Sequence, residues 1–271
     1  MAGHPEAMLV KYGGHALADP ASLQTVVDAL RRVRQRGARL VLVHGGGPAI
    51  GRLLDAAGVR SVFVGGHRKS DAETLRHVAM ALRGEVNLDL VRRLNLAGLR
   101  AVGLSGVDAG MVRARRRVHR ENGRETDLGQ VGDVDRIDTR LLESLLAAGM
   151  LPVLAPLALG EDGLVYNDNA DLFAGHLAAA LKVDLFAVLT DVDGLRRDPA
   201  DAATRIARLS VAESAALAGT TVRGGMIPKL ESCRVALAGG VARACILDGT
   251  SPAGLDEALA GAAEHGTELL P

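Results

Sequence analysis

The stretch from Arg39 to Gly51, RLVLVHGGGPAIG, constrains the fold of this chain most. Its apolar, β-branched run Leu40–Val43 predicts a buried strand that stops at His44. Three glycines and Pro48 follow, which predicts a tight loop opening into a helix, because proline suits the first helical turn. Glycines let a ligand approach the backbone, and the free N–H groups at a helix start favour negative charge. The stretch therefore predicts an anion cradle, and a ligand-free strand-to-helix turn is the alternative.

The same strand-to-glycine pattern occurs earlier in the chain. Ala7–Lys11 predicts a short strand, and Tyr12-Gly13-Gly14-His15 follows it directly. Asp19-Pro20 then opens a predicted helix over about 21–36, with apolar residues on one face. A β-α-β-α order with a glycine turn after each strand predicts a parallel sheet with both turns at the same edge. Two glycine loops that converge on one crevice indicate an anion site more strongly than either loop alone.

The rest of the chain continues this alternation of buried strands and amphipathic helices. Between Met111 and Arg136 apolar and polar residues alternate, as in antiparallel strands with one wet face, and residues 59–66 suit a hairpin. Further strands are predicted over 100–104, 151–155, 185–189, 205–207, 241–247 and 267–270, and helices over about 70–96, 139–148, 211–218, 229–238 and 253–263.

The long helix over 70–96 has a recognisable start. Ser70 is followed three residues later by Glu73, which predicts a capping box. Arg68 and Lys69 precede the helix, where side chains reach over a crevice. A surface arginine at a helix entrance is usually only solvated. Arg68 could therefore either contact a ligand or simply face solvent.

The basic cluster Arg113–Arg120 raises the question of nucleic acid. Acidic residues lie close by, and the chain has two tyrosines, three phenylalanines and no tryptophan, which leaves little for base stacking. Lysine plus arginine and aspartate plus glutamate both number 32, so no whole-chain field favours nucleic acid or an anionic membrane. We therefore predict a solvated hairpin and no nucleic-acid partner.

Composition bounds the size and the location of the protein. With 271 residues, 48% of them hydrophobic and 24% charged, the chain can build one large α/β domain or two lobes. No apolar run approaches the roughly 20 residues of a membrane span, and the start lacks the basic and apolar segments of a signal peptide. Cys233 and Cys245 lie in apolar contexts, which favours buried thiols in a reducing compartment. We expect a cytoplasmic protein without a membrane partner.

Two polar stretches lie where α/β proteins bind ligands. Asn167, Asp168, Asn169 and Asp171 crowd before a helix, and N-capping explains one such residue but not four. Thr190–Gly194 follows a buried strand, at the end where α/β sheets place their ligands. Both stretches are therefore candidates for a binding site.

A third unusual stretch is Thr220–Lys229, TTVRGGMIPK, which holds two glycines and then a lysine at a helix start. A lysine in the first turn opposes the helix dipole, which is mildly unfavourable unless an anion is bound. Lys229 is thus a candidate anion ligand, although first-turn lysines without a role are frequent.

Together these residues resemble the motifs of the amino-acid kinase family, and within it the acetylglutamate kinase branch. Each motif alone is modest, but their joint occurrence in family order is specific. The matching pieces, from about residue 8 to 268, are Lys11-Tyr12-Gly13-Gly14, Val43–Pro48, Ser70–Thr74, Val102–Gly106, Asn167–Asp171, Leu189–Gly194 and Gly224–Lys229.

The resemblance implies an α/β fold, a three-layer αβα sandwich around a mainly parallel sheet, with two lobes of one continuous fold. The N-terminal lobe, 1–182, would bind the acyl amino acid and carry dimerisation, and the C-terminal lobe, 183–271, would bind ATP. The implied reaction transfers the γ-phosphoryl group of ATP to the side-chain carboxylate of N-acetyl-L-glutamate, giving an acyl phosphate for arginine biosynthesis. Such chemistry needs two anions pressed together in line and the transferring charge neutralised.

The resemblance also implies roles for single residues. Lys11 and Lys229 would flank the phosphoryl group and stabilise its charge, and Asp171 would hold both lysines. Arg68 would grip the α-carboxylate of the substrate bidentately, and Asn167 would anchor its amide end. The implied glycine-loop N–H donors are Gly13, Gly14, Gly45 and Gly46. The further implied contacts are Asn169 in the substrate shell and, in the nucleotide pocket, Thr190, Asp191, Gly194, Gly224, Gly225 and Met226. Mg²⁺ is expected on the ATP phosphates, with no residue assigned to metal.

Two departures from the family pattern concern the acceptor. His15 stands where the family usually has asparagine, and the segment Gly65–Ser70 is more polar and more basic than its counterpart around Arg68. Extra positive charge there would suit a glutamate or aminoadipate carried by a small acidic protein, so a carrier-linked or other N-acylated acceptor is the alternative substrate. A non-catalytic amino-acid-binding regulator is the alternative of another class, and the two lysines with their bridging acid argue against it.

Arginine-inhibited members of the family carry an extra N-terminal helix that links dimers into a ring. Only ten residues precede Lys11, too few for that helix. We therefore expect a homodimer, paired through the 71–96 helix region, without arginine feedback.

Overall fold

The core of the protein is a single eight-stranded sheet. The computed structural model describes residues 5–13, 19–121, 123–198, 200–217, 222–251, 255, 256, 258 and 266–271. All neighbouring strands pair in parallel except β13 and β14. In spatial order the strands are β12 (Arg208–Ser210), β14 (Gly266–Leu270), β13 (Arg243–Asp248), β11 (Leu185–Thr190), β1 (Ala7–Tyr12), β2 (Arg39–His44), β8 (Leu151–Ala155) and β5 (Ala101–Ser105). The predicted mainly parallel α/β sheet is confirmed.

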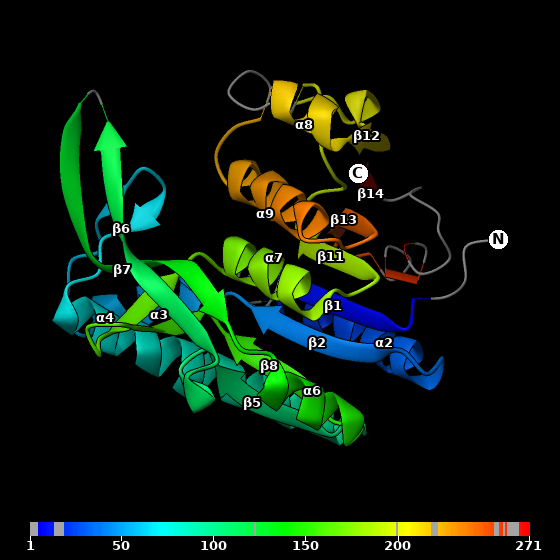
Figure 1. Cartoon of the computed structure of the whole chain (residues 1–271), viewed down its shortest axis with the longest axis horizontal. Coiled ribbons are helices and arrows are strands. Elements are labelled where there is room, and N and C mark those ends of the chain that lie inside the picture. The colour runs from blue at the N-terminus through cyan, green and yellow to red at the C-terminus, as the bar shows by residue number, and fades with distance from the viewer. Residues whose placement is uncertain are drawn as a thin grey trace.

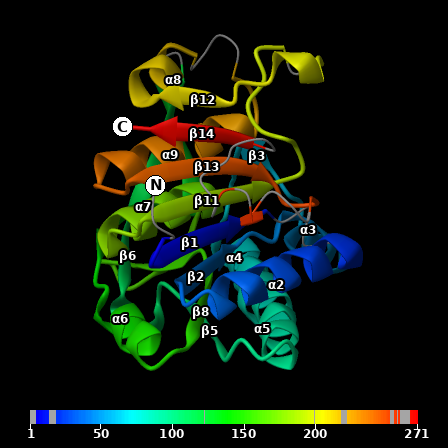
Figure 2. The same ribbon diagram turned by 90° about the vertical axis from the view of Figure 1, so that its right-hand side faces the viewer.

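Helices cover both faces of this sheet, which makes three layers (Figures 1 and 2). On one face lie α2 (Pro20–Gln35) and α5 (Asn87–Leu96), and on the other α6 (Arg140–Ala147), α7 (Ala170–Leu181) and α9 (Met226–Ala238). The alternation along β1 explains how both faces are filled. Met8 and Val10 join the core under α2, whereas Leu9 joins the core under α7, and all three side chains are fully buried.

A smaller closed barrel stands beside the main sheet. It contains β6 (Val112–Glu121), β7 (Arg124–Ile137), β9 (Leu157–Gly160) and β10 (Val165–Asp168). β6 and β7 form a long antiparallel hairpin that rises away from the body of the molecule (Figure 1). The predicted antiparallel region is thus confirmed, whereas β9 and β10 were not predicted. β9 follows β8 after a single residue, and β10, VYND, lies in the polar stretch before α7.

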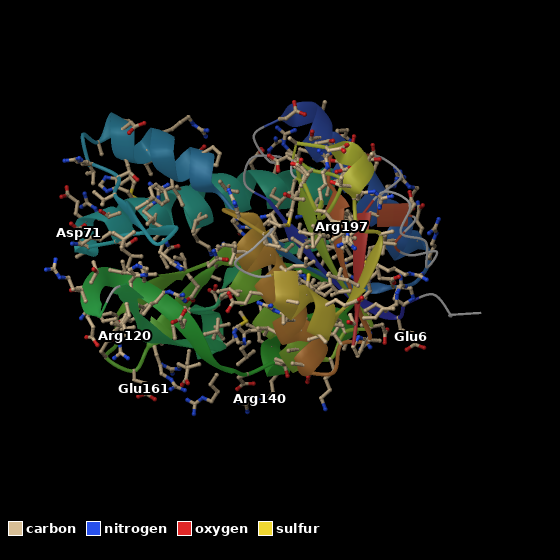
Figure 3. The ribbon with its side chains drawn as sticks, turned by 90° about the horizontal axis from the view of Figure 1, so that it is seen from above. Glu6, Asp71, Arg120, Arg140, Glu161 and Arg197 are labelled. Atoms are coloured by element: carbon tan, nitrogen blue, oxygen red, sulfur yellow. The ribbon has the colours of Figure 1, made fainter. Side chains whose placement is uncertain are left out.

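The arginines of this hairpin are largely paired across it. Arg115, Arg116 and Arg117 form ion pairs with Asp135, Asp127 and Asp133. The labelled side chain of Arg120 projects from the outside of the molecule, where it pairs with Glu125 (Figure 3). These contacts agree with the prediction of a solvated hairpin.

The long helix after Ser70 differs from its prediction in two respects. Its cap is Asp71, which accepts a hydrogen bond from the Thr74 amide at 2.8 Å, and not Ser70. Ser70 is instead buried against the barrel, with its amide donating to Leu128 O at 2.9 Å. The helix also changes its winding: α4 (Ala72–Ala79) continues as a π-helix, η1 (Met80–Val86), before α5.

The other elements are short. They comprise α3 (Gly47–Ala56), β3 (Phe63–Val64), β4 (His67–Arg68), η2 (Asp108–Gly110), η3 (Ala202–Thr204) and α8 (Val211–Leu217). β3 and β4 form a hairpin, which starts and ends a few residues later than the predicted range 59–66. The predicted edge strand near 205–207 is wrong in position, since the strand at this edge of the sheet is β12, and the backbone of Arg205 forms an isolated β-bridge with Arg196.

Some expectations on the fold stay predictions. The helix expected over 253–263 falls mostly outside the described residues, as do Gly14 and His15. The division into lobes at residue 182 runs between strands of one continuous sheet, since β11 pairs with β1. Among the described helices, none has the length and apolar character needed to cross a membrane.

Candidate active site

The two glycine loops lie side by side at one edge of the sheet, as predicted. Tyr12 and His44, the last residues of β1 and β2, are register partners. The Gly13 amide donates to Leu189 O at 3.2 Å, and the Gly45 amide donates to Tyr12 O at 3.0 Å. These two of the four predicted donors are therefore engaged in backbone bonds, and Gly14 lies outside the described residues. The Gly46 amide has no partner among the described residues, so of the three predicted donors that the structure describes it is the one that stays available to a ligand.

Three charged side chains from distant parts of the chain meet at the same edge. Lys11 at the end of β1 places Nζ 2.7 Å from Oδ1 of Asp171, in the first turn of α7. Lys229, in the first turn of α9, places Nζ 3.3 Å from the other carboxylate oxygen of Asp171. One carboxylate thus bridges two ammonium groups, the arrangement that the family resemblance implied.

Burial governs the electrostatics of this group. The Lys11 side chain is 5% exposed and that of Asp171 is 8% exposed. Burial lowers the pKa of Lys11, and repulsion by Lys229 adds to this, while Asp171 opposes it. For Asp171 burial opposes ionisation, but the two ammonium groups outweigh it, so the pKa of the carboxyl lies below its usual value. Two lysines and one carboxylate therefore share a site in which none of the three side chains is more than 15% exposed.

These side chains open into a cavity of about 360 Å³ between the glycine loop and the starts of α7 and α9. Pro48 and Ile50 of α3, Gly66 and Leu82 complete part of its wall. The predicted site residues that line it are Lys11, Gly13, Gly45, Gly46, Asn167, Asn169, Asp171, Thr190, Asp191 and Lys229. A mixed wall of amide groups, cations and a few apolar side chains suits a small anionic ligand.

A second hollow, of about 290 Å³, contains the other predicted nucleotide residues. Gly194, Gly224 and Met226 line it, together with Val192, Leu195, Val222, Arg196 and Arg223. Gly225 adjoins it as the residue before α9. The two hollows share elements, because Asp191 and Lys229 line the first while Val192 and Met226 line the second.

Asn167 and Asn169 have different local roles. Asn169 caps α7, since its Oδ1 accepts hydrogen bonds from the amides of Asp171 at 2.9 Å and Leu172 at 3.2 Å. The simpler capping interpretation therefore accounts for its side-chain oxygen. Asn167 lies in β10, paired with Val131 and Leu157, and lines the cavity without capping a helix.

Arg68 does not line the cavity. Its guanidinium donates to Ser61 Oγ and stacks 4.6 Å from the ring centroid of Phe63. Gly66, at the turn of the same hairpin, does reach the cavity wall. Arg68, the predicted carboxylate-binding residue, thus lies on a hairpin that reaches the cavity, but its side chain contacts Ser61 and Phe63 instead of the cavity.

Sequence reasoning gave no role to two buried groups near the cavity, His44 and Asp168. His44, immediately before the glycines, is fully buried and bonded on both ring nitrogens. Asp168 is 5% exposed, and neither carboxylate oxygen has a hydrogen-bond partner among the described residues. Burial, with a smaller contribution from Asp133, raises the pKa of Asp168 well above its usual value. The polarity of 167–171 was a usable signal for Asp168, whereas nothing in the sequence indicated the partner of His44.

The fold and the site together define an α/β protein whose cavity is lined by a glycine loop and by two lysines from outside that loop. A sequence profile of the amino acid kinase family matches residues 6–248, and the chain belongs to that family. It is 42% identical over 250 residues to the acetylglutamate kinase of Symbiobacterium thermophilum, which covers 91% of this chain and 85% of that protein. It is 43% identical over 253 residues to the acetylglutamate kinase of Pelotomaculum thermopropionicum, covering 91% and 86%.

Solved structures share the architecture. N-acetylglutamate synthase from Neisseria gonorrhoeae, complexed with coenzyme A and N-acetyl-glutamate, superposes with a TM-score of 0.81 at 25% identity, over 98% of this chain and 59% of that chain. Carbamate kinase from Giardia lamblia, bound to AMP-PNP, superposes with a TM-score of 0.67 at 16% identity over 99% of both chains. At that identity the second likeness concerns the fold alone.

Proposed function

We propose that this protein phosphorylates the side-chain carboxylate of N-acetyl-L-glutamate with ATP, forming an acyl phosphate for arginine biosynthesis. The observation that carries the proposal is the Asp171 carboxylate held between Lys11 and Lys229 at the wall of an anion-sized cavity. Membership of the amino acid kinase family and the identity to acetylglutamate kinases over most of the chain support the same reaction.

The three charged residues suit phosphoryl transfer without a covalent intermediate. Attack by a carboxylate on the γ-phosphorus brings two anions together, so the main task is to neutralise charge and hold the groups in line. Lys11 and Lys229 approach from different elements and place positive charge beside the transferring group. Asp171 fixes both ammonium groups before any ligand arrives, so their orientation does not have to be acquired during the reaction.

The glycine loop and β10 would hold the acceptor. The Gly46 amide is positioned to donate to the attacking carboxylate or to the phosphoryl oxygens, at the start of α3 where the helix dipole adds positive potential. Asn167 offers both a donor and an acceptor to the amide end of the substrate. Arg68 is assigned the α-carboxylate, and reaching it requires the guanidinium to leave Ser61 and Phe63.

The nucleotide would occupy the other side of the cavity. Thr190 and Asp191 lie at the carboxyl end of β11, and the mainly apolar hollow of Gly194, Gly224 and Met226 suits a flat base. Of the acids at the main cavity, Asp171 is held by lysines and the Asp168 oxygens are buried, which leaves Asp191. The protein thus offers a hard cation few oxygens, and Mg²⁺ would neutralise charge mainly on the ATP phosphates.

Two measurements together test the reaction. ADP release, measured by a coupled assay, and hydroxylamine trapping of the acyl phosphate are followed with Mg-ATP and each acceptor. The acceptors are N-acetylglutamate, N-acetylaminoadipate, free glutamate and a carrier-linked glutamate. We expect trapped product with N-acetylglutamate at the highest kcat/KM. A higher kcat/KM with the carrier-linked acceptor would show that this acceptor, and not N-acetylglutamate, is the substrate. No turnover on any acceptor would overturn the enzymatic proposal.

We also assign the protein to the cytoplasm and to a homodimer. Cys233 and Cys245 are free, buried thiols, which fits a reducing compartment. Leu88 and Leu96 on α5 are 66% and 77% exposed, and Met80 on η1 is 53% exposed, which supports pairing through this helix. Light scattering on the protein and on the double variant Leu88→Glu/Leu96→Glu tests this, with loss of the dimer expected in the variant.

A further inference from the structure

The strongest feature outside the charged group is a buried hydrogen-bond network behind the glycine loop. His44 is 0% exposed, and its Nδ1 lies 2.8 Å from the carbonyl oxygen of Gly45. Its Nε2 lies 2.9 Å from Nδ2 of Asn87, which is also fully buried. The Asn87 amide nitrogen donates in addition to Val153 O at 3.0 Å. The imidazole therefore joins the loop to the first residue of α5.

The partners fix which ring nitrogen carries the proton. Asn87 Nδ2 can only donate, so His44 Nε2 accepts. The carbonyl of Gly45 can only accept, so Nδ1 carries the hydrogen and donates to it. Burial, together with the positive charge of Arg83, lowers the pKa of His44 to about 4, although the bond to Gly45 opposes this. The imidazole is thus neutral, in a single tautomer, throughout the physiological pH range.

The side-chain oxygen of Asn87 is also hydrogen-bonded, to Arg83. Arg83 Nη1 donates to Asn87 Oδ1 at 3.0 Å, and Arg83 Nη2 donates to the carbonyl of Gly103 at 2.9 Å. A β-carbon at Gly103 would collide with Asn87 Oδ1, so only glycine leaves room for this pair. Every polar atom of the Asn87 amide is therefore engaged, which orients it without alternatives.

The π-helix η1 packs against the same glycine loop at Gly46. A β-carbon at Gly46 would lie 2.6 Å from Leu82 Cδ2 and 3.4 Å from Val86 Cγ2, both on η1. η1 thus packs directly on Gly46, and Asn87, the residue that follows it, holds His44. π-helical turns are uncommon and occur frequently at functional sites.

We propose that His44 is a positioning residue, which fixes the Gly45–Gly46 peptide so that the Gly46 amide points into the anion cavity. In a trans peptide the carbonyl and the following N–H point in opposite directions, so a carbonyl held at His44 turns the Gly46 N–H away from it. That amide has no partner among the described residues, and Gly46 lines the cavity. Asn87 is the second member of the device, because it sets the tautomer that can donate to Gly45. The proposal deepens the proposed function and rests on it.

The variant Asn87→Asp gives the sharpest test, since it keeps the shape of the side chain and replaces the donor by an acceptor. His44 must then donate from Nε2, and it keeps its bond to Gly45 only as the doubly protonated imidazolium. We expect kcat/KM of this variant to fall as pH rises through the new titration of His44, with an inflection between about pH 6 and 8 that is absent from the wild type. Asn87→Leu, which removes the network, is expected to lower kcat about tenfold to a hundredfold while KM for ATP changes by less than about threefold.

Imidazole ¹⁵N NMR of the histidine-labelled protein measures the tautomer and the titration of His44 independently of enzymatic activity. We expect one wild-type histidine signal with the Nδ1–H pattern that does not titrate between pH 5.5 and 9, and in Asn87→Asp a titrating signal in its place. The matched control is His77→Gln, because His77 is also buried and bonded to a backbone carbonyl, Glu73 O at 2.9 Å, on a helix outside the cavity wall. This variant is expected to keep the wild-type pH profile.

The outcomes separate the two proposals. A wild type that turns over no acceptor overturns the proposed function, while the NMR result still decides the tautomer of His44. An active wild type in which Asn87→Asp keeps a flat pH profile, or Asn87→Leu keeps kcat within about twofold, overturns the role of His44.

Discussion

Lys11 Nζ and Asp171 Oδ1 lie 2.7 Å apart, with both side chains less than a tenth exposed. The pair joins the end of β1 to the start of α7, so it connects the sheet to the helix layer as well as preparing a site for an anion. Lys229 touches the other oxygen at 3.3 Å and is more exposed, at 15%. The two lysines therefore have unequal shares in stability and, under the proposed function, similar shares in catalysis.

Alanine substitution of each lysine tests this difference. We expect Lys11→Ala and Lys229→Ala each to lower kcat by about 10²–10³-fold, the cost of one donor to a developing charge, ~2.7–4 kcal/mol. Only Lys11→Ala breaks the short buried pair, so it alone should lose about 3–5 kcal/mol of unfolding free energy. Steady-state kinetics and urea unfolding measure the two effects. Lys182→Gly is the control, since this lysine ends α7 at a positive φ of 48° and should keep kcat. Equal stability losses in the two alanine variants would contradict the ranking.

Asp171→Asn tests the charge of the bridging acid through pH. The pKa of Asp171 lies below its usual value in the folded protein, because the two ammonium groups outweigh its burial. Its contribution to stability is therefore complete above the unfolded pKa of about 3.9 and is lost as pH falls through the lower folded pKa. We expect the asparagine variant to be less stable at pH 7 and to lose less stability on acidification. Urea unfolding from pH 7 to pH 3 gives both slopes, and parallel curves for variant and wild type would refute the assignment.

Much of the main sheet and its ligand edge could be predicted, because local signals coincide there with global topology. A buried strand followed by glycine fixes both the end of β1 and the end of β2, and parallel pairing then places Lys11 beside the Gly45 loop. The convergence of Asp171 and Lys229 on this edge came from the resemblance. Their spacing along the chain carries no information about contact.

The features that were missed depend on tertiary contacts. Ser70 and Asp71 both suit a helix cap. Asp71 caps the helix because the backbone of Ser70 pairs with the barrel, where the Ser70 carbonyl oxygen accepts from the Gln130 amide at 2.6 Å. The π-turn of η1 has ordinary helical spacing in sequence, and the His44–Asn87 bond joins two elements that no periodicity relates. Arg68 was predicted at the substrate, but a nearby aromatic ring and a hydroxyl hold it on its own hairpin.

Gly46→Ala tests the close approach of η1 to the loop. The new methyl group would lie 2.6 Å from Leu82 Cδ2, so either Leu82 or the loop must move. We expect kcat/KM to fall about tenfold or more, since small displacements of a positioned donor cost that much. The double variant Gly46→Ala/Leu82→Ala should recover part of the loss, because it removes the colliding atom.

The matched control for that series lies on the same helix. Gly51 is inside α3 and nothing lies within 4 Å of its missing β-carbon. Gly51→Ala should therefore keep activity and gain about 0.5–1 kcal/mol of stability from helix propensity. If the double variant is no more active than Gly46→Ala alone, the contact with Leu82 is not the cause of the loss.

Asp168 gives a prediction of the opposite sign to Asp171. Its carboxyl is buried without a hydrogen-bond partner among the described residues, and a β-carbon on Gly132 would lie 2.5 Å from its Oδ1, so it is tightly enclosed. Burial, reinforced by Asp133, raises its pKa well above the usual value, so the folded protein binds a proton that the unfolded chain has released near pH 4. Stability must then decrease as pH rises from about 4 towards the folded pKa. We expect Asp168→Asn, which keeps the shape and cannot ionise, to be more stable than the wild type at pH 8 and to show a flatter pH dependence in urea unfolding.

The control is Asp162→Asn: this carboxylate accepts from the Tyr166 hydroxyl at 2.7 Å, and that bond lowers its pKa, so its loss should destabilise the protein. A wild type whose stability is level between pH 5 and pH 8, or an Asp168→Asn variant that is less stable at pH 8, would show that the buried carboxyl has a partner in solution.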